Sequence, residues 1–148
     1  MADQIVVPLK SSTKHAAIDE LVDSLATHSS VKDIESVRGS VHDREALMST
    51  GVGLGLGLPH SKSTGVVETV VALGISPTGI NFESIDGLPV NIVFLLVGPE
   101  AARSEHIRIL SWISRLMNRE DVRQALGRAT SPAEVMTVFD SIDSKTLA

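Results

Sequence analysis

The chain contains no cysteine and no tyrosine. The absence of cysteine excludes disulfide frameworks, thiolate metal sites and cysteine nucleophiles. A covalent nucleophile in this protein must therefore come from serine, threonine, histidine, lysine, aspartate or glutamate.

Long apolar runs and an excess of positive charge are also missing. The most apolar stretch, residues 90–97, has the length of a strand, well short of the ~18 residues that indicate a membrane span. The N-terminus lacks the basic start and apolar core of a signal peptide, and the net charge of −5 argues against nucleic-acid binding. We expect a cytoplasmic protein that forms a single domain, residues 1–148, and neither binds nucleic acid nor inserts into a membrane.

The most informative segment that is present alternates glycine with apolar residues from Gly51 to Leu58. Strict alternation is the side-chain period of a strand, and four glycines on one face indicate that something packs closely against it. Pro59 is expected to end this strand, which leaves His60 at its tip. The glycine spacing fits neither the dinucleotide-binding fingerprint nor the P-loop. A plain alternative is a buried glycine-rich strand followed by an ordinary loop histidine.

The remaining pattern predicts strands interspersed with helices. A short first strand is followed by two helices, the glycine-rich strand, further strands and a helical last third. The expected strands are residues 5–9, 66–75, 80–82 and 90–97, and the expected helices are residues 13–27, 31–48, 105–117, 118–127 and 131 onward.

Arg44 occupies an unusual position in the second predicted helix. It falls on an apolar stripe at helical spacing that otherwise contains Ile34, Val37, Val41 and Met48. One interpretation is that its stem covers the core while the guanidinium reaches solvent. The other is that the charge points inward to a site beside the glycine-rich segment, and spacing alone favours the first.

Five histidines are candidates for chemistry. His15, His28 and His42 are expected to be solvated surface residues. No H-x-H or H-E-x-x-H pattern and no carboxylate cluster with ligand spacing is present, so no metal site is predicted. His106 falls in the first turn of a predicted helix, on the stripe that faces the core. His60 and His106, together with Arg44 and Asp86, are therefore the polar residues that call for an explanation.

Neutral imidazole is a competent nucleophile at physiological pH. A phosphohistidine needs hydrogen-bond donors for its oxygens. Glycine backbone, Ser61, Ser63 and an arginine can supply these donors. Residue types and spacing support a phosphorylated histidine only to this extent.

Several segments in the same order resemble the type-2 enzyme IIA family, the fructose-, mannitol- and nitrogen-type IIA proteins of the bacterial phosphoenolpyruvate-dependent phosphotransferase system. The resemblance extends over nearly the whole chain. The matching segments are Arg44-Glu45, Thr50-Gly51, Gly57-Leu58-Pro59-His60, Asp86-Gly87-Leu88-Pro89-Val90, Gly98-Pro99-Glu100 and Glu105-His106-Ile107.

This resemblance implies an α/β fold in which a mixed central β-sheet is flanked by helices on both faces. It implies that His60 is the phosphoryl acceptor, that His106 lies beside it, and that Arg44 helps to balance the phosphate charge. The chain departs from the family pattern at Gly57, where alanine is common, and at Ser61, where glycine, alanine or cysteine is usual. Ser61 is expected either to donate to the phosphoryl group or to narrow the docking surface.

The function implied is that of a histidine-phosphorylated phosphotransferase component without a cofactor. It would accept a phosphoryl group from HPr, or from a paralogue of HPr, and pass it to a cysteine of a IIB partner for sugar uptake. Because this chain has no cysteine, it is not itself that IIB component. The alternative is a nitrogen-type regulatory protein whose phosphorylation state controls partner proteins without sugar transport. A degenerate relative that no longer accepts phosphate is a third possibility, although both histidines and the arginine are present.

Overall fold

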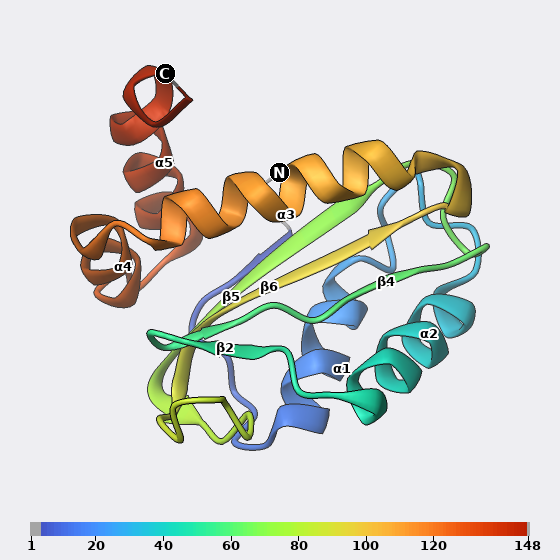
Figure 1. Ribbon diagram of the computed structural model, residues 1–148, viewed down its shortest axis with the longest axis horizontal. Helices are drawn as coiled ribbons and strands as arrows, with labels where there is room; N and C mark the ends of the chain where they lie inside the picture. The colour runs from blue at the N-terminus through green and yellow to red at the C-terminus, as the bar shows by residue number, and fades with distance from the viewer. Residues whose placement is uncertain (1–3, 148) are drawn as a thin grey trace.

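The computed structural model describes the backbone of residues 4–147 and the side chains of residues 4–141, so both predicted domain limits, 1 and 148, lie outside the described residues. The helices and strands follow one another in the order shown in Figure 1. They are β1 (Ile5–Val6), α1 (Lys14–Ser24), α2 (Ile34–Leu47), β2 (Gly51–Gly53), β3 (Leu56–Gly57), β4 (His60–Lys62), β5 (Val70–Ile80), β6 (Val90–Gly98), the 3-10 turn η2 (Glu100–Ala102), α3 (Arg103–Met117), α4 (Glu120–Gly127) and α5 (Pro132–Leu147).

The strands form one mixed six-stranded sheet in the order β1-β5-β6-β3-β2, with β4 also paired to β6. β6 pairs antiparallel with β5 and parallel with β3 and β4, while β1 is parallel to β5. The near-continuous apolar sequence of β6 agrees with this central place, because a strand buried on both faces has no polar side to alternate with. The prediction of a mixed sheet in a single-domain α/β fold is confirmed.

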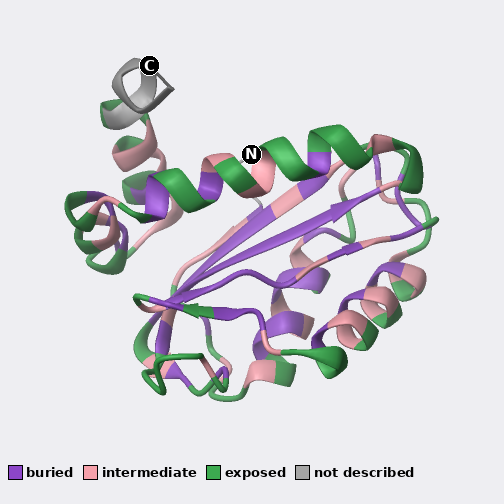
Figure 2. Ribbon diagram, viewed as in Figure 1, coloured by how far each residue is buried: buried purple, intermediate pink, exposed green. Residues whose placement is uncertain are grey.

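Helices cover both faces of the sheet, as predicted (Figure 1). One apolar cluster joins α1 and α2 to one face, and a second joins α3, α4 and α5 to the other. In α1, α2 and α3, buried residues recur between exposed and half-buried ones, as in helices that pack one side against a sheet (Figure 2). Alternate residues of β6 point to opposite faces of the sheet and so belong to different clusters. Val93, Leu95 and Val97 are in the first cluster, and Ile92 and Phe94 are in the second.

The glycine-rich segment is a β-hairpin, and the prediction of one continuous strand is wrong. β2 and β3 pair antiparallel, with Gly51 opposite Gly57. Between them Gly53, Leu54 and Gly55 have φ angles of 96°, 59° and 76°. Glycine adopts these left-handed angles without steric cost, so two of the four glycines serve the turn.

The other two glycines match the predicted close approach. A Cβ atom on Gly51 would overlap Ser84, and one on Gly57 would lie 3.0 Å from the ring of Phe82. Phe82 is fully buried, so its ring has little room to move away. The alternation of glycine with apolar residues therefore reflects two separate needs, a tight turn and close packing.

We expect Gly57→Ala to destabilise the protein by about 1–3 kcal/mol, because the added methyl group overpacks a closed core. Gly39→Ala is the matched control. Gly39 lies exposed within α2, a Cβ atom there meets nothing within 4 Å, and alanine is favoured over glycine in a helix by about 0.5–1 kcal/mol. Urea unfolding of the two variants should therefore shift the midpoint in opposite directions, and an unchanged midpoint for Gly57→Ala would contradict the packing argument.

Candidate functional site

His60 is the first residue of β4, which pairs parallel with β6 so that His60 lies opposite Leu96. It therefore begins a strand of its own instead of ending the glycine-rich one. Its half-buried ring places Nδ1 2.8 Å from the carbonyl oxygen of Leu58. A carbonyl only accepts, so Nδ1 carries the hydrogen, and in the neutral ring Nε2 keeps its lone pair. Leu58 thereby selects the nitrogen that is free to act as a nucleophile.

His106 lies beside this ring, as expected. It occupies the first turn of α3 and is buried, and the centroids of the two imidazole rings are 5.7 Å apart with their planes inclined by 56°. Gly98 at the end of β6 packs beside it: a Cβ atom there would lie 3.4 Å from Nδ1 of His106, an ordinary contact, and 3.0 Å from Oγ1 of Thr69. Sequence reasoning placed both residues at the site. Their proximity is a structural fact, and their catalytic roles remain predictions.

The environment of His106 favours its neutral form. Burial lowers the pKa of His106, and the nearby His60 and Lys62 lower it further because positive charge there opposes protonation. Its Nδ1 atom is buried and has no hydrogen-bond partner among the described residues. Because a buried N–H without a partner is costly, we infer that the neutral ring carries its hydrogen on Nε2, which makes that atom a donor.

This depressed pKa predicts a dependence of stability on pH. The unfolded chain takes up a proton on His106 near pH 6.5, whereas the folded protein resists protonation until lower pH. The contribution of His106 to stability should be present above pH 6.5 and should be lost as the pH falls toward the folded-state pKa. We expect His106→Gln to flatten the fall in unfolding free energy between pH 7.5 and 5.5, measured by urea unfolding. An equally steep fall in the variant would contradict this prediction.

Lys62 is a site residue that the sequence reasoning missed. It follows His60 by two positions in β4, so both side chains leave the strand on the same face. Its charge acts on His106. The i, i+2 spacing from the histidine was visible in the sequence, but residues 61–65 lie outside every predicted strand, and outside a strand that spacing does not place two side chains on one face.

Ser61 points the other way, toward α2. It is buried, and its hydroxyl lies 3.0 Å from that of Ser40, which also donates to the carbonyl of Val37. Because Ser40 uses its one hydrogen on that carbonyl, Ser61 donates to Ser40. Ser61 therefore ties β4 to α2 and does not offer its hydrogen to a group on His60, against one of the two expectations for it.

The buried stripe of α2 differs from the predicted one. It consists of Val37, Val41 and Glu45, while Met48 is exposed beyond the helix end. The Glu45 carboxylate accepts from Thr50 N at 3.0 Å and from Thr50 Oγ1 at 2.8 Å, which anchors the entry to β2. The position on the buried stripe that sequence spacing gave to Arg44 thus belongs to the next residue, Glu45.

Arg44 is half-buried on the flank of that stripe. Among the described hydrogen bonds, its guanidinium makes one, to the carbonyl of Met48 at 3.1 Å. It follows Ser40 by one helical turn, so it lies on the side of α2 that meets β4 through Ser61. The structure brings His60, His106 and Lys62 together and places Arg44 on the neighbouring helix.

Asp86, the remaining polar candidate, has a structural explanation. Its two carboxylate oxygens accept from the backbone N–H of Leu54, at the hairpin tip, and of Leu88. It therefore joins the hairpin to the loop before β6.

None of the described helices is long and apolar enough to cross a membrane.

The order of these elements and residues is that of a known family. The sequence profile described as "Phosphoenolpyruvate-dependent sugar phosphotransferase system, EIIA 2" matches residues 1–142. The chain belongs to this EIIA 2 family. It is therefore a component of a phosphotransferase system, and the resemblance noted in the sequence is confirmed.

Relatives from both branches of the EIIA 2 family are similar to this chain. The fructose-specific EIIA component of Haloferax volcanii is 35% identical over 131 residues, which cover 88% of this chain and 85% of that protein. The fructose-specific EIIABC component of Bacillus subtilis is 32% identical over 139 residues, which cover 94% of this chain but only 22% of that longer protein. The crystal structure of nitrogen regulatory protein IIA-Ntr from Neisseria meningitidis superimposes with a TM-score of 0.85 at 29% identity, covering 93% of this chain and 94% of that one.

Proposed function

We propose that this EIIA 2 protein is a cytoplasmic phosphocarrier that accepts a phosphoryl group on Nε2 of His60 and passes it to a IIB partner. The observation that carries the proposal is the hydrogen bond from His60 Nδ1 to the Leu58 carbonyl. It leaves Nε2 as the nucleophilic atom on a half-buried ring, next to a second, buried imidazole. Family membership supports the reaction class, and the geometry supports the atom.

The transfer reaction balances without a cofactor. The lone pair of His60 Nε2 attacks the phosphorus of a donor phosphohistidine, the donor N–P bond breaks, and its electron pair returns to the donor nitrogen. Leu58 holds the Nδ1 hydrogen throughout and offsets the positive charge that develops on the ring. Only the phosphoryl group is transferred from one protein to the other.

His106 and Lys62 supply what the phosphoryl oxygens need. An Nε2–H of His106 is a donor on the ring beside His60, and Lys62 contributes positive charge from the same face of β4. The first turn of α3 adds the partial positive charge of a helix N-terminus. Because a phosphoryl group brings close to two negative charges, these groups stabilise the charge as it arrives.

The partners follow from the chemistry of transfer between proteins. The donor in this proposal is HPr or a paralogue, and the acceptor is a cysteine of a IIB component. Such encounters need a small and transient docking face. Ile107, directly after His106 in α3, is exposed, as are Val52 and Leu54 on the hairpin that precedes His60, and these apolar side chains are our candidates for that face.

The decisive experiment is to incubate the protein with enzyme I, HPr and phosphoenolpyruvate and to identify the modified atom. We expect one acid-labile, base-stable phosphoryl group on His60, and ³¹P–¹H NMR should assign it to Nε2. Label on His15, His28 or His42 would refute the acceptor assignment. Label on Nδ1 of His60 would refute the role given to Leu58.

A second function is supported by the likeness to nitrogen regulatory protein IIA-Ntr. In that case the phosphorylation state of His60 controls partner proteins, and no phosphoryl group passes to a IIB component. Adding a fructose-type IIB protein to the phosphorylated chain separates the two functions. Rapid loss of label to the IIB cysteine supports sugar uptake, and retention of the label supports regulation. IIB and IIC genes beside the gene for this chain would favour uptake.

A further inference from the structure

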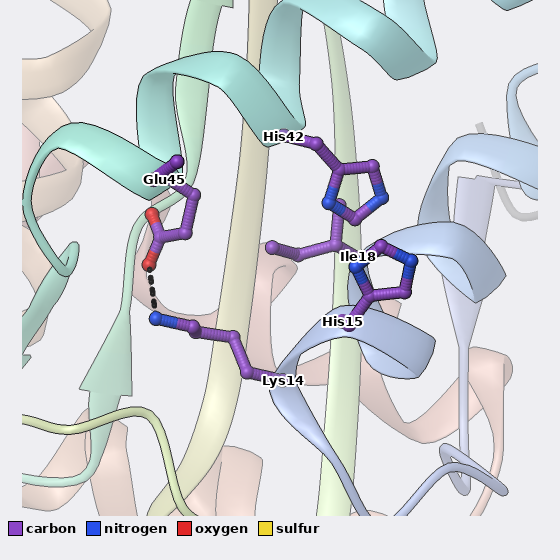
Figure 3. Close-up of a pocket in the computed structure, with 6 residues that line it drawn as sticks. Lys14, His15, Ile18, His42 and Glu45 are labelled. Carbon is purple, nitrogen blue, oxygen red and sulfur yellow. Dashed lines mark ion pairs between the residues drawn. The ribbon is translucent and has the colours of Figure 1, made fainter.

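A cluster of metal-ligating side chains lies between α1 and α2, apart from the His60 site. His15 and Asp19 are one turn apart on α1, and His42 faces them from α2. Asp19 Oδ1 is 2.8 Å from His42 Nε2, and Asp19 Oδ2 is 3.4 Å from His15 Nε2. The imidazole rings of His15 and His42 are stacked, with their centroids 4.0 Å apart. Both rings line the pocket that Figure 3 shows.

We propose that His15, Asp19 and His42 form a binding site for a divalent transition-metal ion of the zinc class. Two imidazoles and one carboxylate are a ligand set that zinc accepts, with water in the fourth position. Neither the family assignment nor the proposed phosphocarrier function includes this site.

The ligand atoms lie near enough for one metal ion, provided that the His15 ring turns out of its stack on His42. Ligand atoms around tetrahedral zinc are separated by roughly 3.3 Å, as bond lengths near 2.1 Å require. In this structure the three ligand atoms already lie within 4.8 Å of one another. The side chain of His15 is 75% exposed, so its ring can turn toward the ion while Asp19 and His42 stay in place. The adjoining pocket of about 310 Å³ leaves room for a water ligand.

The charge balance around the cluster also favours a cation. Arg38 donates to Asp19, but it pairs with Asp23 and Glu35 as well, so three carboxylates share one guanidinium. Lys14, which lines the same pocket, is paired with Glu45 and Glu83 (Figure 3 shows the first pair). Five carboxylates thus pair with two cations, and this excess of negative charge around the cluster favours binding of a positive ion.

Asp19 is held in place for such an ion. Arg38 donates to its Oδ1 atom at 2.9 Å and orients the carboxylate as an outer partner commonly does for a metal ligand. Spacing within the sequence missed this site because the third ligand comes from a different helix, 23 residues after Asp19.

The test is calorimetric titration of Zn²⁺ into protein without a histidine tag. The reference is the variant carrying His60→Ala and His106→Ala, so that those imidazoles cannot bind the ion. We expect one Zn²⁺ per chain. In that background His15→Ala and His42→Ala should each weaken binding at least about tenfold, since each removes one of three ligands.

Matched controls distinguish the metal ligands from nearby residues that do not bind the ion. His28→Ala removes a histidine outside the cluster, and we expect it to leave the affinity unchanged. Asp19→Asn and Asp23→Asn each remove a carboxylate that pairs with Arg38, but only Asp19 faces the imidazoles. Weakened binding in Asp19→Asn alone supports the proposal, whereas equal effects of the two variants would overturn it.

Thermal unfolding gives a second readout that does not depend on activity. An ion at 100 times its dissociation constant should raise the Tm by roughly 5–10 °C for a chain of this size. His15 is an exposed residue, so His15→Ala is expected to fold and to lose this rise. No binding of Zn²⁺, or an equal Tm rise in His15→Ala, would overturn the proposal.

Discussion

His60→Ala is expected to abolish phosphorylation by phospho-HPr, whereas His106→Gln should still be phosphorylated, but more slowly. The difference arises because only His60 has a nitrogen prepared for attack, with Nδ1 bound to the Leu58 carbonyl and Nε2 free. His106 is buried beside that ring, and in the proposed mechanism it donates a hydrogen bond to the transferred group. Loss of such a positioned group costs roughly a hundredfold in rate.

Rapid-quench measurement of label transfer from phospho-HPr checks both variants, with His28→Ala as a histidine control away from the site. Circular dichroism confirms that each variant is folded. Full phosphorylation of His60→Ala would remove His60 as the acceptor. A rate for His106→Gln equal to that of the unchanged protein would show that the neighbouring ring is only packed there.

The arrangement of helices and strands was largely predictable because apolar periodicity is strong in this chain. The continuous apolar character of residues 90–97 correctly identified the central strand β6. The hairpin was not predicted, because glycine at every second residue has the same period whether it serves a turn or close packing. Only the backbone angles of Gly53 and Gly55, and the contact that a Cβ on Gly57 would make with Phe82, separate the two uses.

The site was predictable only in part for a related reason. His60 and His106 are recognisable from motifs and first-turn position, and the structure brings their rings together. The burial of Glu45 was not predicted because the predicted stripe ran through Arg44, its neighbour in the sequence. Successive residues of a helix point about 100° apart, so only one of these two side chains can enter the core, and it is Glu45. Lys62 was passed over because its importance depends on β4 being a strand.

The second large effect concerns the positive charge that balances the phosphoryl group, which we assign to Lys62 and Arg44 together. Each residue replaced by methionine keeps its apolar stem and loses its charge. We expect Lys62→Met and Arg44→Met each to slow transfer by about ten- to a hundredfold, which corresponds to the roughly 1.5–3 kcal/mol of a charge-assisted hydrogen bond. Arg44→Lys should recover only part of the rate, because an ammonium group lacks the planar fork of donors.

A second measurement separates the two cations. The charge of Lys62 acts on His106, whereas Arg44 is not among the groups that shift its pKa. Lys62→Met should therefore raise the pKa of His106 in the unphosphorylated protein, followed by NMR titration of its ring, and Arg44→Met should leave that pKa unchanged. Lys10→Met, at an exposed position on the loop before α1, is the charge-matched control for both measurements. Unchanged transfer by Arg44→Met together with slow transfer by Lys62→Met would assign the charge that balances the phosphoryl group to Lys62 on β4. Arg44 would then serve only to cap the end of α2 through its hydrogen bond to the Met48 carbonyl.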